Sequence, residues 1–326
     1  MRICISITSA FTKMNTCSAS EPLLAEAAFR LLSDSPASPV TRLANHPHLS
    51  CIDQGRHGEL VAALIIMQAR DMSLPRPLLH RRWVFVTEFF QALLPWGASY
   101  PFLESLPTHW RNGEQNIPFR QRFADCRLWF NHVIKVEDSE VIRPEFLWKY
   151  ITRGAMIVCK DNQEGIDLIL PVSTSLDEPL SRRTVTAITI QVKTSVTYGL
   201  HPNKKIFGAM DPSQLGLLSD NPRPVIRMVF ALASSEAGVR LPPRRTRHSD
   251  KFTSYDIWCA GLSPDSFHQT GPDLESYRKL LDHSRPSHYA FDVSETLPNQ
   301  LSEATKIIVE NTRRSMTPLV RFRDHD

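Results

Sequence analysis

Two short apolar runs limit most strongly what this chain can fold into. They are GIDLILPV at 165–172 and TAITIQVKT at 186–194. Both are rich in β-branched residues, which favour extended structure, and turn-forming residues bound each of them. A third run of this kind, AMIVC at 155–159, precedes them. The pattern predicts three strands in a meander.

Side-chain alternation divides the third strand into an apolar and a polar face, since successive residues of a strand point in opposite directions. The apolar face carries Ile188, Ile190 and Val192. The polar face carries Thr189, Gln191 and Lys193. On the preceding strand, the alternation gives one face to Ile166, Leu168, Leu170 and Val172. It leaves Asp167 pointing with Ile169 to the other face.

Asp167 is the only carboxylate inside this strongly hydrophobic run. A buried carboxylate is costly unless it is paired or bound to a metal. An antiparallel neighbour with Gln191 and Lys193 would offer it an amide and a cation at cross-strand range. The alternatives are a structural ion pair between the two strands, or polar residues without function on an edge strand.

The rest of the chain predicts an α+β protein with a mixed sheet flanked by helices. A short amphipathic helix is expected at 21–32, and a second helix, apolar on nearly every side and therefore buried, at about 59–70. Two further strands are expected in VIRMVFALA and YDIWCAGL. We assign residues 1–50 to an N-terminal helical segment or tail and 51–326 to one domain. Within that domain, 154–262 form the sheet core and 71–145 a helical insertion or cap.

Composition indicates a soluble globular protein, with 42% hydrophobic and 22% charged residues and a net charge of +4. The six cysteines form no CxxC pair, which argues against a zinc knuckle and against a disulfide scaffold. The most apolar long stretch, 83–103, is interrupted by Glu88 and Pro95, so no membrane helix is expected. A nuclear or cytoplasmic location fits these features.

The segments Gly165-Ile166-Asp167 and Gln191-Val192-Lys193 resemble the PD-(D/E)XK nuclease superfamily. The likeness is greatest to its Mrr-like members, which have Gln-x-Lys as the second half of the motif. This resemblance implies a restriction endonuclease-like core in which Asp167 and Gln191 bind Mg²⁺ or Mn²⁺. It also implies that Lys193 is the catalytic cation that positions or polarises the attacking water.

Glu59 looks like the acidic residue that many members of this superfamily carry on the first core helix. The resemblance therefore makes Glu59 a third metal ligand and an auxiliary catalytic residue. The alternative is that Glu59 stabilises the first turn of its helix through the macrodipole, an effect of about 0.3–1 kcal/mol.

A wider resemblance covers the runs SEPLLAEAAF, GELVAALIIMQARD and RGAMIVC. They are similar to the C-terminal part of large fungal proteins that end in such a nuclease-like domain. The resemblance implies a Mg²⁺-dependent nuclease that acts on nucleic acid, with DNA as the expected substrate. The alternative is a catalytically silent module that binds nucleic acid or protein, because Gln191 supplies oxygen but no charge.

The basic stretch Arg244-Arg245-Thr246-Arg247-His248, with Lys251, permits two interpretations. It could contact phosphates or act as a nuclear import signal. It could equally be a solvated loop between strands.

Overall fold

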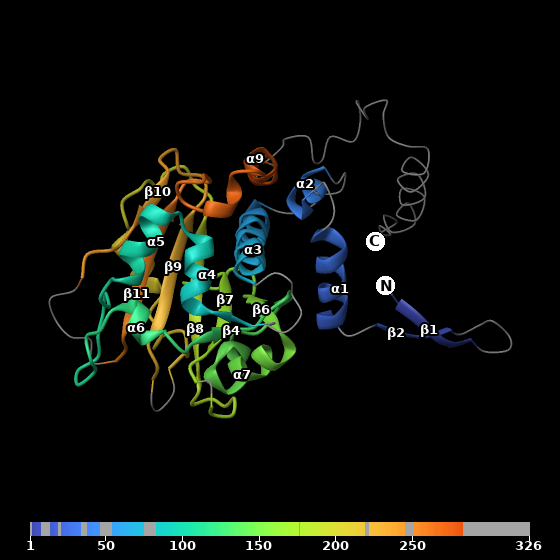
Figure 1. The fold of residues 1–326 in the computed structure, drawn as a ribbon, viewed down its shortest axis with the longest axis horizontal. Helices are drawn as coiled ribbons and strands as arrows, with labels where there is room; N and C mark the ends of the chain where they lie inside the picture. The colour runs from blue at the N-terminus through green and yellow to red at the C-terminus, as the bar shows by residue number, and fades with distance from the viewer. Residues whose placement is uncertain are drawn as a thin grey trace, which may run out of the picture. The chain divides into compact units, whose positions relative to one another are not determined.

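The expected meander lies in the centre of a mixed β-sheet (Figure 1). The computed structural model describes residues 2–7, 14–18, 21–33, 38–45, 54–74, 83–175, 177–218, 222–244 and 251–282. Within these ranges the main sheet has nine strands. They are β3 (Val84–Phe85), β4 (Arg127–Leu128), β5 (His132–Lys135), β6 (Ala155–Val158), β7 (Leu168–Ser173), β8 (Val185–Lys193), β9 (Val225–Ala231), β10 (Gly238–Arg240) and β11 (Ser254–Ala260).

Strand β8 has an antiparallel neighbour, β7, on one side and a parallel neighbour, β9, on the other, while β5 is parallel to β6 and β10 is antiparallel to β11. Strand β7 pairs antiparallel with both β6 and β8, as the meander predicts. After β8 the chain passes through α8 (Lys204–Ala209) and returns as β9, which is parallel to β8 and to β11. The carboxyl end of β8 and the beginning of β7 therefore lie at the same edge of the sheet.

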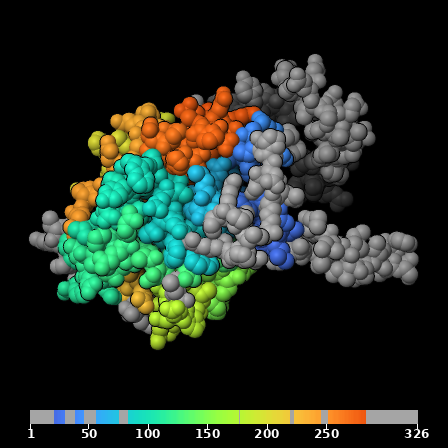
Figure 2. Space-filling view, in the orientation of Figure 1, coloured from blue at the N-terminus to red at the C-terminus, as the bar shows by residue number. Residues whose placement is uncertain are grey.

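Helices cover both faces of this sheet. The chain order of the helices before α8 is α1 (Glu21–Ser33), α2 (Pro39–Ala44), α3 (Gln54–Ser73), α4 (Val86–Leu93), α5 (Trp96–Leu103), α6 (Phe119–Arg122), the 3₁₀ turn η2 (Ser139–Ile142) and α7 (Pro144–Arg153). The 3₁₀ turn η3 (His268–Thr270) and α9 (Leu274–Asp282) follow the last strand. From the side drawn in Figure 2, the chain of α4–α6 and α9 forms a large part of the surface, and the central strands seen in Figure 1 lie beneath it. A mixed sheet flanked by helices agrees with the predicted α+β class.

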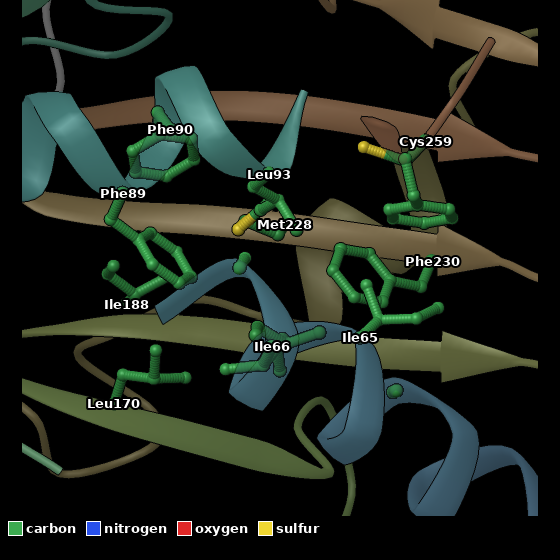
Figure 3. Close-up of a cluster of buried hydrophobic side chains, with 14 of the residues drawn as sticks. Ile65, Ile66, Phe89, Phe90, Leu93, Leu170, Ile188, Met228, Phe230 and Cys259 are labelled. Carbon is green, nitrogen blue, oxygen red and sulfur yellow. The ribbon is translucent and has the colours of Figure 1, made fainter. Parts of the chain in front are cut away.

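The first core cluster fills the space between the sheet and the helices α3 and α4 (Figure 3). Ile65 and Ile66 of α3, together with Phe89 and Phe90 of α4, face apolar side chains of β7, β8, β9 and β11. The apolar side of β8 belongs to this cluster, which confirms the predicted face of Ile188, Ile190 and Val192. Burial of α3 on the sheet likewise agrees with its apolar sequence.

The second core cluster lies on the other face, where α7 and α8 pack. It includes Ile169, as alternation predicts, but also Ile166, which we expected on the opposite face with Leu168. The prediction for Ile166 is wrong because β7 begins only at Leu168. The turn before it passes through Gly165 at φ +83°, so the alternation of the strand does not extend back to residue 166.

Residues 71–145 contribute strands as well as helices. Strands β3 and β4 join the sheet next to β7, and β5 pairs parallel with β6. The expected helical insertion is therefore also part of the sheet. Before residue 50 the chain forms α1, α2 and a separate two-stranded sheet of β1 (Arg2–Ile7) and β2 (Met14–Ser18). Among the described helices, none has the length and apolar character needed to cross a membrane.

Candidate functional site

Asp167 is held between two neighbouring strands by its backbone. Its amide N donates to the carbonyl O of Ile190 at 2.9 Å, and its carbonyl O accepts from the amide N of Cys159 at 2.8 Å. Gly165 fixes the approach to this position, since a Cβ there would lie 2.2 Å from the carbonyl O of Ala209. The local sequence therefore presents the Asp167 side chain at the edge of the sheet where β8 ends.

The carboxylate of Asp167 contacts the Gln-x-Lys segment directly. Its Oδ2 accepts two hydrogen bonds of 2.6 Å, one from Gln191 Nε2 and one from the backbone N of Val192. Gln191 is 6% exposed, whereas Asp167 and Lys193 are half-buried. The structure thus brings together the three residues that the sequence indicated.

The electrostatics of Asp167 combine opposing effects. Burial raises the pKa of this carboxyl. The Val192 N–H, the positive charge of Lys193 and the Gln191 amide lower it again, but burial prevails. Lys193 is therefore close enough to act on Asp167, and the carboxylate keeps a higher proton affinity than a carboxylate in water.

Glu59 lies on α3, in its second turn, because the helix begins at Gln54 and not near Glu59 as expected. The macrodipole effect falls off within the first turn, so this position weakens the purely helix-stabilising explanation. Next to it, Gly58 packs against the end of β8, and a Cβ at Gly58 would lie 2.4 Å from Thr194 Cγ2. The helix therefore brings the half-buried Glu59 to the strand that carries Gln191.

The carboxylates of Asp167 and Glu59 both affect the thiol of Cys159. Burial raises the pKa of this thiol, and the negative charges of Asp167 and Glu59 raise it further. Both carboxylates therefore act on the same buried sulfur, although one comes from β7 and the other from α3. The thiols of Cys126, Cys159 and Cys259 are free and buried.

The donor atoms of the site fit a hard divalent cation. Asp167 Oδ1 and Gln191 Oε1 take part in no hydrogen bond within the described protein, and Glu59 adds a second carboxylate nearby. Mg²⁺ prefers such oxygen ligands. The described residues contain no group of three or more His, Cys, Asp and Glu that could hold a metal ion. A site here would therefore depend on the Gln191 oxygen and on water.

A second polar cluster, which the sequence analysis missed, lies inside the sheet. Arg227 of β9 donates from Nε to Asp256 Oδ1 at 2.8 Å and from Nη2 to Asp256 Oδ2 at 2.5 Å. Its Nη1 donates to the carbonyl O of Phe207 at 2.8 Å, and its Nη2 lies 3.0 Å from His109 Nδ1. Arg227 is 1% and Asp256 2% exposed. The sequence signal was a single charged residue inside each of two apolar strands, Arg227 in β9 and Asp256 in β11.

This cluster is a structural ion pair and not a Ser-His-Asp triad. Burial raises the pKa of Asp256, but the charges and hydrogen bonds of Arg227 and His109 outweigh it and bring the pKa to about 2. Ser254 Oγ and Asp256 Oδ2 both approach the same ring nitrogen, Nδ1 of His109, at 3.2 and 3.4 Å. A Ser-His-Asp triad needs one partner on each ring nitrogen.

Arg244, the first residue of the basic stretch, has a structural role. Its Nε donates to the carbonyl O of Pro107 at 3.1 Å, and its Nη2 donates to Asn116 Oδ1 at 3.0 Å. Its guanidinium carbon lies 5.0 Å from the centre of the Trp110 ring. Residues 245–248 lie outside the described ranges, so phosphate contact by the whole stretch stays a prediction.

Comparison of the chain with protein-family models, with curated proteins and with solved structures finds no match.

Proposed function

We propose that this chain is a metal-dependent nuclease of the restriction endonuclease-like class that hydrolyses phosphodiester bonds in DNA. The observation that carries the proposal is the contact of the Asp167 carboxylate with Gln191 and Val192, beside the cation of Lys193. The expected compartment is nuclear or cytoplasmic.

The order and direction of the elements around this contact support the proposal. Helix α3 precedes the antiparallel meander of β6, β7 and β8, with β3–β5, α4–α7 and η2 between them in the chain, and the meander is followed by α8 and the parallel strand β9. A restriction endonuclease-like core has this order, with the acidic residue at the second strand and the second half of the motif on the third. In this chain Asp167 lies directly before the second strand of the meander, and Gln191-Val192-Lys193 ends the third strand, an arrangement that supports the proposal.

Each side chain has a defined role in the proposed reaction. Asp167, Gln191 and Glu59 would hold Mg²⁺ or Mn²⁺, which supplies a Lewis acid for the phosphate and lowers the pKa of a bound water. The bonds from Gln191 Nε2 and Val192 N fix the orientation of Asp167 and leave its Oδ1 free. Lys193 places a positive charge where negative charge develops on the phosphate in the transition state.

The test is cleavage of plasmid and linear DNA by the purified full chain in Mg²⁺ or Mn²⁺. Asp167→Ala is expected to abolish cleavage, and Lys193→Ala to slow it about 10²–10³-fold, as loss of a transition-state donor does. Asp161→Ala is the matched control, because this exposed carboxylate belongs to the turn that leads to Asp167 but pairs with Arg56 and Lys135. Equal cleavage by wild type and the Asp167 and Lys193 variants would reject the assignment.

The alternative is a silent module that keeps the fold for nucleic-acid or protein binding. One observation favours it: the Gln191 amide and the Val192 N–H both occupy Asp167 Oδ2, so a proposed ligand oxygen is already bonded within the chain. Calorimetric titration with Mg²⁺ or Mn²⁺ separates the two functions. A nuclease is expected to give a binding isotherm that Asp167→Ala removes, whereas a silent module gives no metal-dependent heat in either protein.

A further inference from the structure

A cleft of about 350 Å³ lies at the carboxyl ends of the three parallel strands β8, β9 and β11. The segments that follow these strands line it: Thr194 and Val196 after β8, residues 232–235 after β9, and Leu262 after β11. Helix α9 lines the remaining side. In open α/β sheets, ligands bind in the crevice outside the carboxyl ends of the strands. The position of this cleft is therefore that of a binding site.

The polar side chains of this cleft offer hydrogen-bond donors to a ligand. Arg278 of α9 is exposed, and its guanidinium has no acceptor among the described residues. The same holds for the hydroxyl groups of the half-buried Thr194 and the exposed Ser235. Ser234 Oγ accepts from the backbone N of Glu236 at 3.2 Å, and its own O–H remains available to donate. Arg, Ser and Thr are among the side chains that contact the phosphates of nucleic acids.

The two charged residues of the lining act on an anion in opposite directions. Arg278 and Asp282 both belong to α9 and lie four positions apart, so they share one face of the helix. The guanidinium attracts a phosphate and donates to it, whereas the Asp282 carboxylate repels it. Changes at these two residues are therefore expected to have opposite effects on the affinity for a phosphate.

We propose that this cleft binds a backbone phosphate of the DNA strand through Arg278 and the three hydroxyl groups. The inference rests on the proposed nuclease function, because it assigns a further contact to the same substrate. Thr194 follows Lys193 directly, and Thr194 packs against Gly58, the neighbour of Glu59. The cleft therefore adjoins the proposed catalytic residues. Along one strand of a DNA duplex, phosphates follow one another every ~3.4 Å of helix axis. A strand with its scissile phosphate at Lys193 can thus place another phosphate in the cleft.

The experiment measures binding of a labelled DNA duplex to the full chain by fluorescence anisotropy, in EDTA and over a series of salt concentrations. Arg278→Gln is expected to weaken binding about tenfold, as loss of a charged hydrogen bond predicts. It should also reduce the slope of log K against log salt by about 0.9, the value for one phosphate contact. Arg182→Gln is the matched control, because this exposed Arg precedes β8 and lies at the opposite edge of the sheet. Asp282→Asn is expected to bind DNA more tightly than the wild type.

Equal affinities and salt slopes for Arg278→Gln and Arg182→Gln, with circular dichroism matching the wild type, would overturn the proposal. Weaker binding by Asp282→Asn, or no DNA binding by the wild type, would also overturn it. Inorganic phosphate at constant ionic strength identifies the source of the phosphate. If it weakened DNA binding of the wild type but not of Arg278→Gln, the cleft would take free phosphate, and the assignment to the strand would be wrong. Because EDTA removes divalent metal, the contact is measured even if the nuclease assay fails.

Discussion

Replacement of Asp256 by Asn is expected to cost the fold about 3–5 kcal/mol at neutral pH, the usual effect of breaking one side of a buried ion pair. Arg227 is 1% exposed and donates two hydrogen bonds to Asp256. An amide would give this guanidinium one neutral acceptor in place of a carboxylate. The positive charge would then stay in the interior without a counter-ion, and this accounts for most of the loss.

The pH dependence of stability gives an independent value for the free energy that ionised Asp256 contributes. The pKa of Asp256 is about 2 in the fold against an ordinary value of 3.8, so its ionisation contributes on the order of 2 kcal/mol by linkage. Because the folded-state pKa is lowered, this contribution is present above about pH 4 and is lost as the pH falls toward 2. The Asn variant is expected to lack it.

The assay is urea unfolding at pH 7 and pH 3, followed by the fluorescence of the tryptophans, which include the buried Trp258 of β11. Asp161→Asn removes an exposed carboxylate and is the control, which should leave the free energy of unfolding close to that of the wild type. Arg227→Met combined with Asp256→Leu should recover much of the loss, because no charge is then left buried. A loss below about 1 kcal/mol for Asp256→Asn would refute the reasoning.

Three further changes test the site and its supports. Gly165→Ala should lower the free energy of unfolding by about 2 kcal/mol or more in urea titrations, because of the positive φ and the closeness of Ala209 O. Asp167→Asn should raise the free energy of unfolding at pH 7 but not at pH 3. Burial raises the pKa of Asp167, so ionisation of this carboxyl destabilises the fold as the pH rises. A urea midpoint equal to that of the wild type at pH 7 would contradict this. Gly58→Ala should lower the melting temperature, and Thr194→Ser, which removes the opposing Cγ2, should restore it in the double variant.

The strands of the core were predictable because their signal is local. Alternation over a few residues was enough to place Ile188, Ile190 and Val192 on the face that α3 and α4 cover, and to predict that Asp167 lies beside Gln191. It did not extend to Ile166, since the left-handed turn at Gly165 cannot be read from a hydrophobic pattern. The backbone conformation of Gly165 determines on which face of the sheet Ile166 lies.

The start of α3 and the buried ion pair depend on information that is not local. Gly55 and Gly58 have low helix propensity, so the first turn of α3 could not be predicted from the sequence. Gly58 is nevertheless required where the helix meets Thr194. Arg227 and Asp256 are each a lone charge inside an apolar strand. Their pairing depends on the parallel register of β9 and β11, which places them side by side across an intervening segment of the chain.

The Arg227 cluster also bears on how the chain folds. His109 lies 118 positions before Arg227 and 145 before Ser254, so a long loop must close before the guanidinium is enclosed. Closing such loops costs entropy and slows folding. If β9 and β11 paired before residues 107–111 were in place, the Arg227–Asp256 ion pair would lie at the border of the folded part. This segment would not yet cover it. The sheet and this distant segment are therefore expected to form together, in one late and cooperative step.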